Sequence, residues 1–438
     1  MTAYASASVL TRAADDGSRL LLETAGGITP TGAVHHPSFF SGFVARPDVT
    51  AAALLAVADV AATSYYDLSL LRASLDPVVT ASGDRLRFES FSRCNGVYAR
   101  FDLLDGGIDS GDVRFGTTNV DINQPLRTAL ASVDPAELLH LAVGDDQLTF
   151  STPDQSYVER QVDLPDRWIR GFAEVPVIAS ELEPTADLDK VQTMQFLASL
   201  PQGAPGPTLH LVRTARGLQP GTPDRADVRI AGTARLSTAR RLMRFVVRTR
   251  VYRHPSGASG WVFDLPGGRV TMILTAEPYR GFSGEGGLLR ELDRAEDDAV
   301  RQVHELLAWQ PVIDPDRLAL DAGLRVEQVR SAIAALATSG RVGFDSAEAA
   351  WFHRELPLDP ARQTRDNPRL VRARTIVAQG GVARDRDSWR VTVSDGEHWV
   401  RERAGRAECT CQWQARYGSS RGPCSHVLAV EIAGASTG

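Results

Sequence analysis

Three cysteines and one histidine near the end of this 438-residue chain are the residues best suited to bind a metal. Cys409 and Cys411 form a C-x-C pair, and Cys424 and His426 form a C-x-H pair after twelve intervening residues. Structural zinc sites take four thiolate or imidazole ligands in a closed tetrahedron. The spacing therefore predicts one structural Zn²⁺ ion on these four residues. The alternative is a set of buried, reduced cysteines beside a surface histidine.

The flanking sequence predicts the elements that would position these ligands. Alternating apolar residues predict strands over 389–393 and 398–403, and residues 427–432 predict a short helix. A C-x-C pair in an extended segment places both sulfurs on one side. We expect Cys424 and His426 at the turn that opens the helix, after a loop containing Gly, Ser and Pro. Four protein ligands leave no position for water, so the site is expected to be structural and not catalytic.

The C-x-C-x(12)-C-x-H pattern, in its β-β-α context, resembles the SWIM zinc finger. The longer chain is similar to bacterial SWIM zinc finger family proteins in phrases such as His36-Pro-Ser-Phe-Phe and Gly281-Phe-Ser-Gly. The resemblance implies that Cys409, Cys411, Cys424 and His426 are the zinc ligands. It also implies a partner, because such proteins often accompany MoxR-type AAA+ ATPases and von Willebrand factor A proteins. A non-enzymatic adaptor is therefore expected. The SWIM fingers of transposases and chromatin-remodelling proteins imply nucleic-acid binding as the alternative.

Composition narrows the class of protein. The chain is 43% hydrophobic and 23% charged, with a formal net charge of −6, so it has no overall basic footprint for nucleic acid. Cys94 is the one remaining cysteine, which excludes a disulfide framework and favours a reducing cytoplasm. No signal-peptide pattern is present, and the most apolar stretch, 51–62, is too short to span a bilayer, so no membrane role is expected.

No enzyme motif stands out. The chain has no P-loop, no G-x-G-x-x-G after a strand, no G-x-S-x-G elbow and no H-E-x-x-H, and Cys94 has no histidine nearby in sequence to act as a base. We therefore expect no catalytic residues.

The pattern of elements predicts an α+β multidomain chain in four blocks. These are a mixed α/β domain (1–205), an Arg-rich β domain (206–285), a winged-helix-like domain (286–358) and a ββα SWIM-type zinc finger domain (359–438). The first block is expected to contain helices over 48–66 and 187–200, and a hairpin over 139–151.

The Arg-rich block has eleven arginines and two aspartates between residues 208 and 254. We expect Ser237 to cap a helix that bears several of these arginines on one face, and others to alternate along the next strand. A basic face with an aromatic residue nearby suits a phosphate backbone. A solvated face, or one paired with an acidic neighbour, is the alternative. The candidate nucleic-acid-binding residues, including two in the finger loop, are Arg240, Arg241, Arg244, Arg248, Arg250, Arg253, Arg416 and Arg421.

An acidic block follows, with thirteen carboxylates and seven arginines between residues 291 and 358. Its predicted helices over 291–309, 314–322 and 326–339, followed by two short strands, resemble a winged helix-turn-helix. The local net charge repels phosphate. We therefore expect this segment to bind protein, with the neighbouring basic block as one candidate partner.

Overall fold

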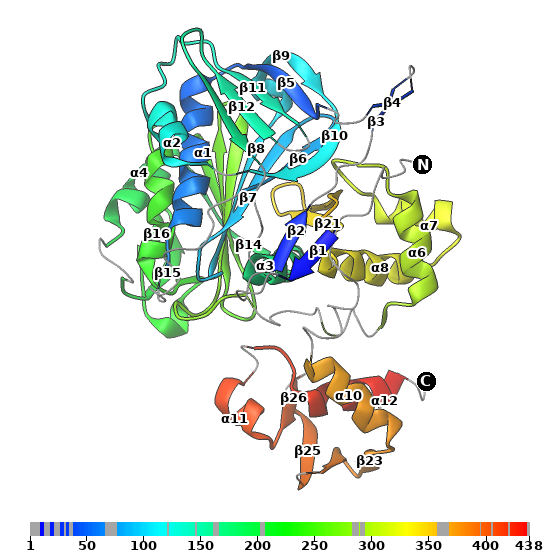
Figure 1. Cartoon of the computed structure of the whole chain (residues 1–438). Coiled ribbons are helices and arrows are strands. Elements are labelled where there is room, and N and C mark those ends of the chain that lie inside the picture. Colours follow the sequence, from blue (N-terminus) through cyan, green and yellow to red (C-terminus); the bar gives the residue numbers. More distant parts are fainter. Residues whose placement is uncertain are drawn as a thin grey trace.

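The computed structural model describes much of the chain. The described residues are 9–12, 18–21, 27–29, 32–34, 38–65, 77–120, 122–144, 147–160, 166–201, 206–282, 289, 294–356, 368–394, 396–403, 406–418 and 421–435. They form a mixed α+β protein with several separate sheets, which confirms the predicted class (Figure 1).

An eight-stranded antiparallel sheet is the centre of the fold. Its strands lie in the order β10–β6–β7–β8–β20–β19–β18–β14. Their bounds are β6 (Val78–Ser82), β7 (Leu86–Phe91), β8 (Val97–Leu103), β10 (Phe115–Asn119), β14 (Glu183–Asp189), β18 (Arg248–Arg253), β19 (Ser259–Leu265) and β20 (Gly268–Leu274). Because β20 pairs with β8 and β18 pairs with β14, strands from both sides of residue 205 share this sheet. The expected boundary at 205/206 therefore runs through one sheet.

Alternation along the central strands gives this sheet one apolar and one charged face. Leu86 and Phe88 belong to the larger hydrophobic core, where helix α1 (Pro47–Ala62) contacts β7 and β8. Arg87 and Glu89, which alternate with Leu86 and Phe88 along β7, point to the opposite face, yet both are buried. Something other than water must therefore cover the charged face.

A five-stranded sheet lies beside the first, in the order β13–β12–β11–β5–β9 (Figure 1). Its inner side chains join the same core as α1, and α2 (Gln124–Ala131) packs against α1. The strands are β5 (Phe40–Val44), β9 (Ile108–Val113), β11 (His140–Val143), β12 (Gln147–Ser151) and β13 (Ser156–Arg160). The predicted hairpin over 139–151 is confirmed as β11 and β12.

Smaller elements complete this half of the molecule. A three-stranded sheet, in the order β16–β15–β17, packs near α4 (Lys190–Ser199), and η4 contacts α1. Two hairpins near the N-terminus pair β1 with β2 and β3 with β4. The bounds are β1 (Val9–Arg12), β2 (Ser18–Leu21), β3 (Gly27–Thr29), β4 (Gly32–Val34), β15 (Leu209–Thr214), β16 (Gly217–Pro220), β17 (Val228–Ile230), η2 (Asp105–Gly107), η3 (Pro223–Arg225) and η4 (Thr233–Leu242).

The acidic segment covers the charged face of the large sheet together with α3 (Asp166–Ser180). It comprises α6 (Asp297–Leu306), α7 (Pro315–Ala322), α8 (Val326–Thr338) and the hairpin of β21 (Val342–Asp345) and β22 (Ala350–His353). Helix α3 contacts β7, α8 and β21. The β21–β22 hairpin carries Phe352, whose ring lies under the guanidinium of Arg87 at 4.0 Å.

Buried ion pairs join this hairpin to the sheet. Arg100 Nη2 lies 3.0 Å from Asp345 Oδ1, and Arg269 also pairs with Asp345. Arg354 Nη1 donates to Glu89 Oε1 at 2.6 Å, with both side chains buried. The sheet's arginines therefore meet carboxylates of the acidic segment, and its buried glutamate meets an arginine of that segment.

The C-terminal part forms a separate four-stranded sheet, in the order β23–β24–β25–β26, packed on helix α12, which lies beside α10 (Figure 1). The bounds are α10 (Pro368–Ala378), β23 (Val382–Asp385), β24 (Ser388–Val393), β25 (Gly396–Arg403), β26 (Arg406–Cys409), α11 (Gln412–Tyr417) and α12 (Ser425–Ala435).

Several local predictions were wrong. Residues 187–189 end strand β14, and Asp189 then caps α4, so the helix expected over 187–200 starts later. Ser237 lies inside η4, where its hydroxyl donates to Ala234 O, and it does not begin an α-helix. The loop expected between the two ligand pairs contains α11, and α3 was not predicted at all.

We predict that Asp345→Asn lowers the free energy of unfolding by about 3 kcal/mol, because the substitution removes one of the two buried carboxylates that neutralise the buried Arg100 and Arg269 and leaves Asp102 alone to pair with both. Asp321→Asn, which removes an exposed pair with Arg317, is the matched control and should change it by less than about 0.5 kcal/mol. Urea unfolding at pH 7 measures both.

The difference in the free energy of unfolding between the wild type and Asp345→Asn should depend on pH. Burial alone would raise the pKa of Asp345, but the guanidinium groups of Arg100, Arg269 and Arg87 hold it well below its usual range. A carboxylate with a lowered folded-state pKa stabilises the protein above its ordinary pKa and loses that contribution as the pH falls below it. The gap between wild type and Asp345→Asn should therefore shrink below about pH 4. A gap independent of pH would contradict the ion-pair account.

Candidate metal centre

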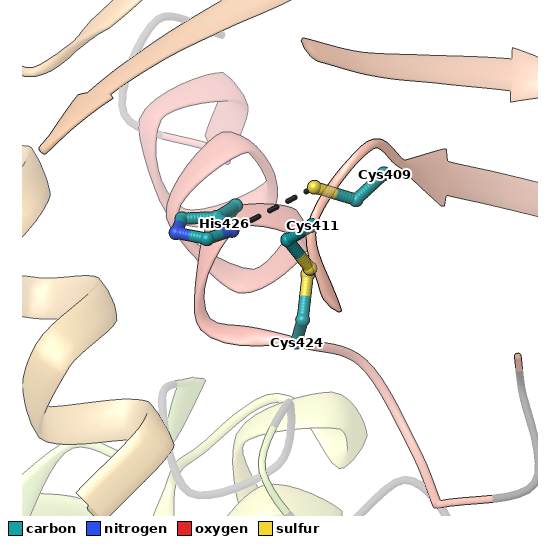
Figure 2. Close-up of side chains that lie close together, drawn as sticks. All are labelled: Cys409, Cys411, Cys424 and His426. Atoms are coloured by element: carbon teal, nitrogen blue, oxygen red, sulfur yellow. Dashed lines mark hydrogen bonds between the residues drawn. The ribbon is translucent and has the colours of Figure 1, made fainter. Parts of the chain in front are cut away.

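The four predicted ligand residues lie at the junction of a strand and two helices. Cys409 is the last residue of β26, and Cys411 precedes the first turn of α11. Cys424 stands immediately before α12, and His426 lies in the first turn of that helix. The structure therefore brings both pairs together at one point, as the sequence predicted (Figure 2).

The geometry of the four side chains fits a tetrahedral zinc ion. Their ligand atoms all lie within 4.8 Å of one another, and Cys409 Sγ is 3.6 Å from His426 Nδ1. Zn–S and Zn–N bonds of about 2.3 and 2.0 Å place neighbouring ligand atoms about 3.5–3.8 Å apart in a tetrahedron. All four residues are buried. Only small shifts separate this arrangement from a coordination shell.

The electrostatics of the cluster favour a thiolate. The Cys409 thiol donates a hydrogen bond that lowers the pKa of Cys424 to about 4, against the opposing effect of burial. The same bond, reinforced by burial, raises the pKa of Cys409. The Val427 N–H, in the first turn of α12, also donates to Cys424 Sγ at 3.4 Å. A bound divalent cation would balance the negative charge of the deprotonated cysteines. Without it, Cys409 and Cys424 share one proton in their hydrogen bond.

The surroundings hold the imidazole in place. The ring of His426 stacks on that of His398, with centroids 4.1 Å apart, and its Nδ1 faces Cys409. Its Nε2 is buried and has no hydrogen-bond partner among the described residues. Binding a metal through Nδ1 requires the tautomer with the proton on Nε2. His398 was not singled out by the sequence, because nothing in its spacing marks it.

The arginines predicted to bind nucleic acid do not form one open surface. Four of them meet carboxylates: Arg241 with Asp59, Arg248 with Asp187, Arg250 with Asp264, and Arg253 with Glu183. Arg240 Nε donates to the Leu197 carbonyl at 3.1 Å, and the Arg244 guanidinium lies over the Phe245 ring. Three of these carboxylate partners, Asp59, Asp187 and Glu183, are 61 or more residues away in sequence and could not be foreseen from the local arginine pattern.

Arg416 and Arg421 lie in and after α11. Both guanidinium groups stack over the ring of Tyr417, at 5.3 and 4.5 Å from its centroid. Arg421 also lies 5.7 Å from the Trp413 ring centroid. The segment between the two ligand pairs is therefore a small cluster of arginines and aromatic rings built on a helix.

Cys94 lies far from this centre. It is buried in the larger hydrophobic core, and its sulfur accepts a hydrogen bond from the Tyr65 N–H at 3.5 Å. Its placement is that of a core residue.

A Cys₃His set held between a small sheet and a helix is typical of a zinc finger. Residues 389–435 match the family model described as "SWIM zinc finger". The chain therefore carries a SWIM zinc finger at its C-terminus, and the cluster of Cys409, Cys411, Cys424 and His426 lies within it. A comparison with curated proteins finds no match.

Solved structures that match part of this chain include three PCNA structures. They are the Proliferating Cellular Nuclear Antigen from Entamoeba histolytica (10% identity, TM-score 0.36), A. fulgidus PCNA bound to the C-terminal region of FEN-1 (13%, 0.37) and the PCNA2–PCNA3 complex from Sulfolobus tokodaii (10%, 0.39). The matches cover 53–54% of this chain and 97–98% of those chains.

The helices were compared with the length and apolar character that a membrane-spanning segment needs. Within the part of the chain that the structure describes, none is both long and apolar enough to cross a bilayer.

We predict that the purified protein binds about one zinc ion per chain and that Cys409→Ser loses it. The variant removes one of four ligands, and structural zinc affinity is coupled to folding. Cys94→Ser, which replaces a buried cysteine outside the cluster, is the matched control and should keep its zinc. Metal analysis of both proteins after gel filtration in reducing buffer measures the content. Wild-type protein that is folded, reduced and free of zinc would contradict the assignment.

Proposed function

We propose that this protein is a non-enzymatic interaction protein whose C-terminal finger is held folded by one structural zinc ion. The observation that carries the proposal is the burial of the whole Cys₃His set within a hydrophobic cluster. Its neighbours there include Val391, Val400 and Val427. A closed, buried set of four ligands organises a fold and leaves no position at which a substrate or water can react.

The metal replaces a core that the finger is too small to build alone. The fully buried apolar side chains between β24, β25 and α12 are Val391, Val400, Val427, Leu428 and Ala429, and domains of this size commonly need a metal or disulfides for stability. With zinc bound, the finger presents a rigid surface of sheet and helix. Such a surface suits recognition of a partner protein.

Charge pairing supports a protein partner over nucleic acid. Binding to a phosphate backbone depends on cationic side chains that exchange counterions for phosphates. Arg241, Arg248 and Arg253 instead have carboxylates of this chain as ion-pair partners. Engaging phosphate would require breaking those pairs.

Helix α8 supports the same conclusion. In the winged helix-turn-helix that the sequence predicts, α8 would be the recognition helix, but most of its residues from Val329 to Thr338 are buried. It contacts α3, α6, α7 and β21. Among its exposed side chains are Glu327 and Arg330, which have opposite charges. This helix lacks the exposed polar and basic face with which DNA-reading helices enter the major groove.

The resemblance to bacterial SWIM proteins predicts a MoxR-type AAA+ ATPase or a von Willebrand factor A protein, and that partnership stays a prediction. A cytoplasmic location also stays a prediction; it is consistent with the four cysteines being free thiols.

We expect isothermal titration of the full-length protein with such an ATPase or von Willebrand factor A protein from the same organism to show saturable binding. The binding should require the folded finger, so Cys409→Ser should abolish it and Cys94→Ser should retain it. Binding that is equal in both variants would show that the finger is not the contact. No binding to either protein would contradict the predicted partnership.

Nucleic-acid binding remains a second candidate because of one observation. Arg416 and Arg421 stack on Trp413 and Tyr417 in the segment between the ligand pairs. Arginines with aromatic rings are the groups that bind single strands by stacking and charge. The overall net charge of −6 opposes such binding.

Filter binding with heterogeneous single-stranded DNA and RNA separates the two candidates. We expect negligible retention at 50 mM salt, and no change for an Arg416→Gln, Arg421→Gln double variant relative to Arg317→Gln, an arginine on the acidic segment. Retention that falls steeply with salt and is lost only in the double variant would favour nucleic acid instead.

A further inference from the structure

A cavity of about 220 Å³ opens between α2 and the end of the β12–β13 hairpin. Its floor is apolar and formed by buried side chains, and its rim is polar. The floor residues are Leu126, Leu130, Leu139 and Phe150. Cofactor and drug-sized sites usually exceed about 300 Å³. The cavity is therefore sized for one apolar side chain.

The rim of the cavity carries negative charge. Glu137 and Asp154 both line it, and among the described lining residues there is no lysine or arginine. Asp154 is exposed, and Glu137 is partly exposed with one carboxylate oxygen accepting from the Asp134 N–H at 3.3 Å. A ligand that fills the floor would therefore be favoured if it placed a cationic group at the rim.

Strand β13 runs beside the cavity and is the edge of its sheet. Gln155, just before the strand, and Tyr157, within it, line the cavity, and no described strand pairs with its outer side. Two apolar side chains near the site are exposed: Leu138, next to Leu139 of the floor, is 61% exposed, and Val158, on the face of β13 opposite to Tyr157, is 50% exposed. An edge strand with exposed apolar neighbours is a template for pairing with another extended segment.

The register of the hairpin shows which backbone groups are available. The Thr152 N–H donates to the Gln155 carbonyl, which makes these residues a hydrogen-bonded pair. Such pairs alternate along antiparallel strands. Phe150–Tyr157 is then hydrogen-bonded and Thr149–Val158 is not. The N–H and C=O of Val158 therefore point away from β12, toward the open side.

We propose that this edge is a docking site for an extended basic peptide segment of a protein partner. The segment would pair with β13 as an added strand and insert one apolar side chain into the cavity. Tyr157 and Phe150 lie on the cavity side of the sheet, so alternate side chains of an added strand face the same way. Lysine or arginine two residues from the inserted side chain would then lie beside Glu137 and Asp154.

This inference deepens the proposed function as an interaction protein and assigns it a second surface, separate from the finger. The described residues that line the cavity lie between 126 and 157, and Val158 adjoins them on β13. Its occupancy does not depend on zinc. The two proposals can therefore fail independently.

The probe is a short fluorescein-labelled peptide that alternates threonine with lysine, leucine and lysine, so that both lysines and the central leucine share one face. We expect fluorescence anisotropy with the full-length protein to show saturable binding. Replacing the leucine by alanine, or both lysines by glutamate, should weaken it at least about tenfold, because each change removes one half of the recognition.

Two protein variants test the two halves of the site. Val158→Pro removes the outward N–H at a position where an edge strand tolerates proline, and it should abolish binding, whereas Val158→Thr should not. Ala129→Phe fills the cavity from α2 and should abolish binding, whereas Thr128→Phe, on the neighbouring exposed residue, should not. Circular dichroism confirms that each variant folds.

Binding that survives both Val158→Pro and Ala129→Phe, or absence of binding by every peptide, would overturn the proposal. A wild-type dimer in gel filtration that Val158→Pro converts to a monomer would also overturn it, by showing that a second copy of the chain occupies this edge. Repeating the titration with Cys409→Ser should leave peptide binding unchanged, which separates this site from the fate of the finger.

Discussion

The buried charges on one face of the large sheet constrain the rest of the structure. Arg87, Arg100 and Asp102 are fully buried, and a guanidinium without a counter-charge in such an environment costs several kcal/mol. Asp345, from the β21–β22 hairpin, supplies part of that counter-charge. The buried charges of the sheet are therefore fully neutralised only when the acidic segment packs against it. The two should unfold together.

This arrangement explains why several arginines of the large sheet contribute to internal ion pairs and not to an open basic surface. Arg269 bridges Asp102 of the sheet and Asp345 of the hairpin, and Arg250 donates to the Ala347 carbonyl as well as to Asp264. Arginine suits this role because its planar group donates in several directions and stays charged when buried. Much of the basic charge between residues 206 and 285 thus holds this protein together.

The sequence predicted the metal cluster because all four residues lie within eighteen positions, and local spacing sets their geometry. It predicted many of the strands from alternation, as for β11 and β12. It could not predict the cover over Arg87 and Glu89, because alternating charge normally marks a solvent-facing side. Ion-pair partners such as Arg100 and Asp345 are separated by more than two hundred residues, and periodicity carries no information on such pairs. Helix α3 was hidden by Gly171 and Pro176, which lower helix propensity and are tolerated here by tertiary packing.

The metal cluster and the buried ion pairs both compensate polar or charged groups that are buried in a core, but they do so by different means. In the finger, Cys424 and its neighbours are polar groups in a core, and a divalent cation would satisfy them together. In the large sheet, the chain itself supplies both signs of charge. The finger's order should therefore follow metal availability, whereas the sheet and acidic segment depend on residues that are always present. A partner that recognises the finger would bind only the metal-loaded protein, and one that binds at β13 would bind either form.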